Sequence, residues 1–70
     1  MPPLAEMCKI ARANLRLSQK QFAYLVGTNQ TEISFIERGF IPENEEKRQN
    51  IQRIYEETKN GIEKNQQTGT

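Results

Sequence analysis

The chain has 70 residues, 34% of them hydrophobic, and its ten basic and nine acidic residues give a net charge of +1. This length supports one domain with a small core, and no apolar run is long enough to cross a bilayer. A single cysteine and the lack of histidine exclude an intrachain disulfide, a Cys- or His-based metal site and the commonest general base. We therefore predict a cytoplasmic protein that is not an enzyme and that uses no metal or cofactor.

The basic residues are distributed unevenly along the chain. Residues 1–42 hold five basic and three acidic groups, whereas residues 43–70 hold five basic and six acidic groups. The excess of positive charge therefore lies in the first part of the chain, but it is small. Any affinity of one copy for a phosphate backbone should be weak and sensitive to salt.

The first predicted helix covers residues 3–15. Pro2 and Pro3 are tolerated at a helix start. The apolar residues that follow are spaced by four, three and four positions: Leu4, Cys8, Ala11 and Leu15. Because Cys8 lies on this apolar face, we interpret it as a core residue rather than a redox sensor.

Two short helices follow, and each has a capping signal at its start. Ser18 with Gln21 forms a capping-box pattern before a helix over residues 19–26, and Asn29 with Glu32 repeats the pattern before a helix that starts at residue 30. Gly27 and Gly39 supply the residues that end these two helices. Their predicted core residues are Phe22, Ala23, Val26, Ile33 and Ile36.

The break between these two helices is too short to reverse the chain into an antiparallel hairpin. The helices must therefore cross steeply, with Ala23 permitting close approach, Gly27 making the turn and Ile33 packing behind it. This arrangement is typical of a helix-turn-helix, in which the second helix projects from the body and can enter a DNA major groove.

A longer, more polar helix is predicted to begin near Asn44, after Pro42. Its narrow apolar stripe comprises Ile51, Ile54, Tyr55, Thr58 and Ile62. Part of the stripe must cover the core, since three short helices bury too little surface alone. The remainder of the stripe is the candidate dimer surface, formed by Tyr55, Thr58 and Ile62. The alternative is that Ile62 frays with the tail.

Residues 63–70 hold no apolar residue and are predicted to be a disordered polar tail, which leaves a domain of residues 1–62.

A resemblance to a known family rests on the segment LSQKQFAYLVGTNQTEISFIERG, residues 17–39. It contains Leu-Ser-Gln, a buried alanine, a turn glycine, Ile-Ser and Ile-Glu-Arg-Gly at matching spacing. From Cys8 to Pro42 the chain resembles the lambdoid phage repressor and Cro-type (XRE-like) helix-turn-helix family. The resemblance implies an all-α, lambda-repressor-like domain of four helices, truncated relative to five-helix relatives. It also implies a Cro-like repressor, encoded by a phage or mobile element, that binds a short palindromic operator in double-stranded DNA as a dimer. The narrow apolar stripe of the last helix predicts that this homodimer is weak, and a chain of one domain is expected to have no domain for a small-molecule ligand.

The resemblance also implies which residues contact DNA. Positions that match base contacts of the family are Gln30, Thr31, Ser34 and Phe35. A glutamine can bond both N6 and N7 of adenine, whereas Phe35 can only press on thymine methyl groups. Phe35 has an alternative place, half-buried beside the last helix or in a protein interface. Positions that match phosphate contacts are Gln19, Lys20, Asn29, Arg38 and the backbone near Phe40.

Two further positions carry structural expectations from the resemblance. In the family, an arginine at the Arg12 position pairs with a glutamate at the Glu37 position, which ties the first helix to the end of the third. Both residues are close to core-facing positions, so the implied pair would be partly buried. Arg16 occupies a position where the family commonly has glycine. Either this arginine takes the left-handed conformation or the first helix ends differently.

Two other functions remain open at this point. An excisionase-like architectural factor would use the same fold to bind direct repeats and bend DNA. An antirepressor-type module would keep the fold but bind protein instead of DNA. The intact Gln19, Gln30 and Thr31 argue against the second alternative.

Overall fold

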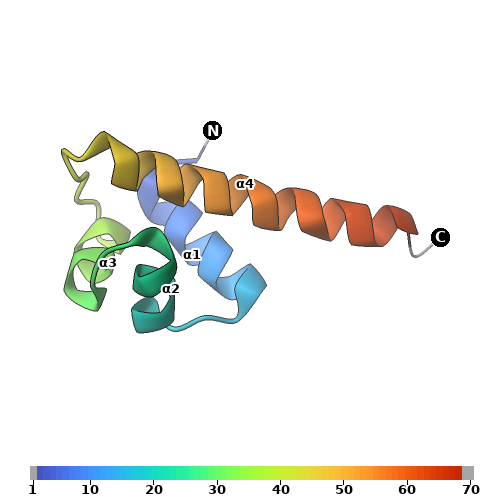
Figure 1. Cartoon of the computed structure of the whole chain (residues 1–70), viewed down its shortest axis with the longest axis horizontal. Helices are drawn as coiled ribbons and strands as arrows, with labels where there is room; N and C mark the ends of the chain where they lie inside the picture. Colours follow the sequence, from blue (N-terminus) through green and yellow to red (C-terminus); the bar gives the residue numbers. More distant parts are fainter. Residues whose placement is uncertain (1, 69–70) are drawn as a thin grey trace.

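The computed structural model describes the backbone of residues 2–68 and the side chains of residues 2–59. Over this range the chain forms four helices and no strand: α1 (Leu4–Leu15), α2 (Gln19–Val26), α3 (Gln30–Glu37) and α4 (Glu45–Thr68). Helix α1 packs against α3 and α4, and α2 packs against α3 and α4. The C-terminal half of α4 runs on past the other three helices (Figure 1). Within the described part of the chain, no helix is both long and apolar enough to cross a membrane.

Helix α1 ends in a left-handed turn at Arg16, whose φ of 57° and ψ of 45° match the first of the two predicted possibilities. Of the apolar residues at the predicted spacing, Cys8 and Ala11 are fully buried and Leu4 packs against the core, together with Met7. Leu15 is 40% exposed and lies outside the core. Leu15 is the last residue of the helix, next to the turn, where the chain is already leaving the core.

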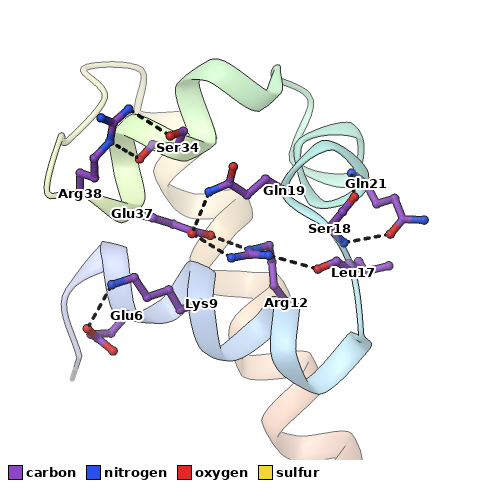
Figure 2. Close-up of polar contacts among 10 residues, drawn as sticks. All are labelled: Glu6, Lys9, Arg12, Leu17, Ser18, Gln19, Gln21, Ser34, Glu37 and Arg38. Atoms are coloured by element: carbon purple, nitrogen blue, oxygen red, sulfur yellow. Dashed lines mark hydrogen bonds and ion pairs between the residues drawn. The ribbon is translucent and has the colours of Figure 1, made fainter.

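The start of α2 confirms the predicted capping box. The Ser18 hydroxyl accepts a hydrogen bond of 3.1 Å from the Gln21 amide, and the Gln21 side chain accepts one of 2.9 Å from the Ser18 amide (Figure 2). The helix ends at Gly27, whose φ of 91° is readily adopted only by glycine. Local hydrogen bonding thus sets both ends of α2 at the predicted residues.

The start of α3 confirms only half of the repeated capping pattern. The Asn29 side chain accepts a hydrogen bond of 2.8 Å from the Glu32 amide. The Glu32 carboxylate does not complete the box, because it accepts hydrogen bonds from Thr28 and Lys47. At the other end Glu37 is the last helical residue and Arg38 is the C-cap. Gly39 follows with a φ of 115° and donates a hydrogen bond of 3.0 Å to the Ile36 carbonyl, so it ends the helix as predicted.

The core lies between all four helices. Its fully buried or nearly fully buried apolar residues are Met7, Cys8, Ala11, Phe22, Ala23, Val26, Ile33, Ile36 and Ile51. Burial raises the pKa of the Cys8 thiol to about 12. A thiol with this pKa holds almost no thiolate at neutral pH, which agrees with the interpretation of Cys8 as a core residue.

The first half of α4 belongs to the folded body. The Asn44 side chain accepts a hydrogen bond of 3.1 Å from the Lys47 amide and so caps the helix. Ile51 is fully buried, and Ile54 and Tyr55 pack against the core. The Asn50 amide donates a hydrogen bond of 3.1 Å to the Val26 carbonyl, a group at the end of α2 that has no partner within its own helix.

The second half of α4 differs from the prediction. The helix continues to Thr68, so residues 63–68 are helical where a disordered tail was expected. The glutamate, lysine and glutamines in this stretch all have good helix propensity, which the absence of apolar residues does not cancel. The side chain of Ile62 and residues 69–70 lie outside the described residues.

Candidate functional site

Helix α3 has one buried face and one exposed face. Ile33 and Ile36 fill the core, while Gln30 and Thr31 are exposed on the opposite side. Phe35 lies on the outer side as well, with 49% of its surface exposed. Three of the four predicted base-contact residues are therefore exposed, and the fourth, Ser34, is half-buried.

The inner face of α3 is tied to α1 by the ion pair that the family resemblance implied. Arg12 Nε lies 2.7 Å from Glu37 Oε2, and Arg12 Nη2 lies 2.9 Å from Glu37 Oε1 (Figure 2). The side chains are 25% and 7% exposed, respectively. Arg12 also donates a hydrogen bond of 3.3 Å to the Leu17 carbonyl. The pair is bidentate and largely shielded from water, so it holds α3 in one orientation relative to α1.

A third residue joins this pair. Gln19, at the start of α2, donates a hydrogen bond of 3.1 Å to Glu37 Oε1, so one carboxylate connects three helices (Figure 2). Gln19 was predicted to bind phosphate. In this arrangement one amide hydrogen is engaged by Glu37, and a phosphate contact would have to use the other. Nothing in the sequence pattern relates residues 18 positions apart, so this contact could not be anticipated.

Helix α4 supports the other end of α3. Lys47 Nζ lies 2.8 Å from Glu32 Oε1, and the Thr28 hydroxyl donates to the same carboxylate oxygen. These side-chain hydrogen bonds, with that from Lys47 the largest cause, lower the pKa of Glu32. The sequence identified Glu32 as a cap, but its main role is to bridge the start of α3 to α4.

The lowered pKa of Glu32 predicts a pH-dependent stability. Its contribution is present above the ordinary carboxyl value of 4.5 and is lost as pH falls through the lower folded-state pKa. We expect Glu32→Gln to lower the melting temperature by a few degrees at most near pH 7, because the pair is partly solvated. Thermal unfolding of both proteins from pH 7 to pH 3 should show the difference shrinking.

The matched control is Glu57→Gln. It removes the exposed partner of Arg53, a pair in which the two side chains are 66% and 70% exposed. This variant should melt like the parent protein throughout the pH range. A Glu32→Gln difference that stays constant down to pH 3 would contradict the assigned bridge.

Arg38 lies across the outer face of α3. Its Nε donates a hydrogen bond of 3.3 Å to the Ser34 carbonyl, and its Nη2 donates one of 3.1 Å to the Ser34 hydroxyl (Figure 2). The guanidinium carbon lies 5.0 Å from the centre of the Phe35 ring. Arg38 is therefore folded back along the helix towards the predicted base-contact residues.

The other predicted phosphate contacts have different surroundings. Lys20, Asn29 and Gln30 line one open hollow between α2 and the start of α3, so two phosphate candidates adjoin a base candidate. The Phe40 amide, by contrast, already donates a hydrogen bond of 3.0 Å to the Phe35 carbonyl. Because this bond completes the end of α3, the Phe40 amide is not free for phosphate.

The three candidate dimer residues differ in how they are packed and exposed. Tyr55 packs against the core and is therefore not a spare surface residue. Thr58 is partly exposed and donates a hydrogen bond of 2.9 Å to the Tyr55 carbonyl. Ile62 falls outside the described side chains. A dimer surface on α4 stays a prediction, with Thr58 as its best-placed described residue.

An exposed apolar area on α2 was missed by the sequence analysis. Tyr24 is 85% exposed and Leu25 is 51% exposed, and both line a hollow with Leu17. The available signal was the position of Tyr24, two residues from both Phe22 and Val26 and therefore on the opposite side of the helix.

No family model, curated protein or solved structure matches this chain.

Proposed function

We propose that the chain is a sequence-specific DNA-binding transcriptional regulator, in which α2 and α3 form a helix-turn-helix and α3 enters the major groove. The observation that carries the proposal is the two-sided character of α3. Its exposed face presents Gln30 and Thr31, while its inner face is fixed by the Glu37–Arg12 ion pair. A rigid helix that exposes uncharged hydrogen-bonding groups suits the reading of base edges.

The chemistry of the exposed face favours DNA over protein as the ligand. The Gln30 amide can donate to N7 and accept from N6 of adenine, and Thr31 offers a hydroxyl and a methyl group. Lys20 is exposed and lines the same hollow as Asn29 and Gln30. Cations at the edge of such a surface would bind phosphates, which position the helix without reading sequence.

A dimer follows from the small size of this surface. One copy offers a recognition helix of eight residues and few cations, which supports only weak binding that is sensitive to salt. Two copies related by a two-fold axis would place their α3 helices about 34 Å apart and read inverted half-sites. We propose that the second half of α4 supplies the contact, because it runs past the rest of the fold (Figure 1).

The proposal can be tested by selecting bound sequences from a library of random DNA duplexes. We expect enrichment of an inverted repeat whose half-sites are about one helical turn apart. Direct repeats would indicate the excisionase-like alternative instead. No enrichment at low salt would contradict DNA reading altogether and leave a protein-binding module.

Gln30→Ala tests whether α3 reads bases. We expect it to lose roughly 1–3 kcal/mol of affinity at the selected site and little on random DNA. Fluorescence anisotropy titrations on both duplexes at one salt concentration would measure this difference. The control is Gln49→Ala, which removes an exposed glutamine of α4 and should leave both affinities unchanged. An equal loss on the two duplexes would show that Gln30 reads no base.

A further inference from the structure

The Arg38 guanidinium is held in place by hydrogen bonds to Ser34 that use only some of its N–H donors. A guanidinium has five N–H groups in a fixed plane. The Nε and Nη2 groups on one edge are occupied by the carbonyl and hydroxyl of Ser34, at 3.3 and 3.1 Å. The other edge, formed by Nη1 and the second hydrogen of Nη2, has no partner among the described residues. Two parallel N–H groups of Arg38 are therefore fixed in position at the exposed end of α3 and can donate to a ligand.

Phe35 contributes to this arrangement from one side. The guanidinium carbon lies 5.0 Å from the ring centre, within the range of about 6 Å in which a cation is attracted to an aromatic face. The ring thus limits the rotation of the guanidinium, and Ser34 sets its position along the helix. An arginine that bound phosphate only as a mobile charge would need neither contact.

We propose that Arg38 reads a guanine base and that Ser34 and Phe35 are positioning residues that hold its guanidinium for this contact. Two parallel N–H donors match O6 and N7 of guanine in the major groove, which is the commonest specific contact made by arginine. This assignment differs from the phosphate role that the sequence suggested for Arg38. It rests on the proposed function, because it requires α3 to lie in the groove.

The position of the side chain favours a base over a phosphate. Arg38 follows the last residue of α3, yet its guanidinium reaches back one turn to Ser34. It therefore lies on the stretch of helix that also carries Gln30 and Thr31, and not on the loop beyond the helix. In the proposed complex, Gln30 would contact a base near the start of α3 and Arg38 would contact a base near its end. Phe35 would lie beside the bases between them.

The test compares the base preferences selected from a random duplex library by the parent protein and by variants. The parent should prefer guanine at one position of each half-site. Arg38→Ala should reduce that preference about ten-fold or more while preferences elsewhere in the half-site persist. Arg38→Lys keeps the charge but loses the planar pair of donors, so it should lose the same preference.

Two pairs of variants test the positioning residues. Ser34→Ala and Phe35→Leu should each weaken the guanine preference several-fold at that same position and leave the melting temperature nearly unchanged. Ser34→Thr and Phe35→Tyr retain the hydroxyl and the ring, so they should keep the preference. A purely structural role would alter all positions together or change the melting temperature.

The possible outcomes separate this inference from the proposed function. If Arg38→Ala weakens binding equally at all sequences and lowers the salt dependence, Arg38 binds phosphate and the inference is overturned while DNA binding stands. If the parent selects a site without a guanine preference that depends on Arg38, the inference is likewise overturned. If the parent selects no site, the proposed function fails and the inference fails with it.

Discussion

Glu37→Ala is expected to lower the free energy of unfolding by about 2–4 kcal/mol, a large part of the stability of so small a domain. The substitution leaves the Arg12 guanidinium in a largely enclosed place without its carboxylate and removes the acceptor of Gln19. The value lies below that for a fully buried pair because a quarter of the Arg12 side chain is exposed to water. Urea denaturation followed by circular dichroism would measure the change.

A double-mutant cycle makes this test specific to the ion pair. Arg12→Met with Glu37→Ala should be less destabilising than the sum of the two single changes, because no unpaired charge is left behind. Glu57→Ala is the control, since its pair with Arg53 is exposed to solvent and should contribute little. A Glu37→Ala protein as stable as the control would mean that the bidentate pair does not form in solution.

Ile51→Ala is expected to destabilise the protein by about 2–5 kcal/mol, enough to leave a substantial fraction unfolded. Ile51 of α4 is fully buried, and it packs in one cluster with residues of the other three helices. Its truncation would leave a cavity at the centre of the fold and remove the apolar contact that anchors α4. Thermal unfolding followed by circular dichroism provides the measurement.

Ile41→Ala is the matched control for this prediction. It makes the same chemical change at a side chain that is 61% exposed, so its effect should stay within about 0.5 kcal/mol. Equal melting temperatures for the two variants would show that α4 is not part of the core, and α1 to α3 would then have to fold without it.

Local patterns in the sequence determined the helices and much of the core. The bounds of α2 follow from the Ser18–Gln21 capping box and the left-handed Gly27, both of which were evident before the structure. The burial of Phe22 and Ile33 also follows from apolar spacing. These features depend on residues within one or two turns of each other, so the sequence contains all the information that they require.

The candidate site was predictable only in part. The spacing of α3 and the family resemblance identified Gln30 and Thr31, which the structure places on one exposed face, and the resemblance alone suggested the Arg12–Glu37 pair. By contrast, the backbone of Phe40 was proposed for phosphate, although the end of α3 uses its amide internally. The folded-back Arg38 was also missed, because an arginine side chain has many rotamers and only its neighbours select one.

Contacts between helices were decided by the tertiary structure. Gln19 meets Glu37 because the fold brings the start of α2 to the end of α3, and Lys47 meets Glu32 because it brings the first turn of α4 to the start of α3. Tyr55 belongs to the edge of the core for the same reason. Periodicity shows which face of a helix is apolar, but it contains no information about the angle and position at which two helices cross. Those are set by how the side chains of all four helices fill one shared space.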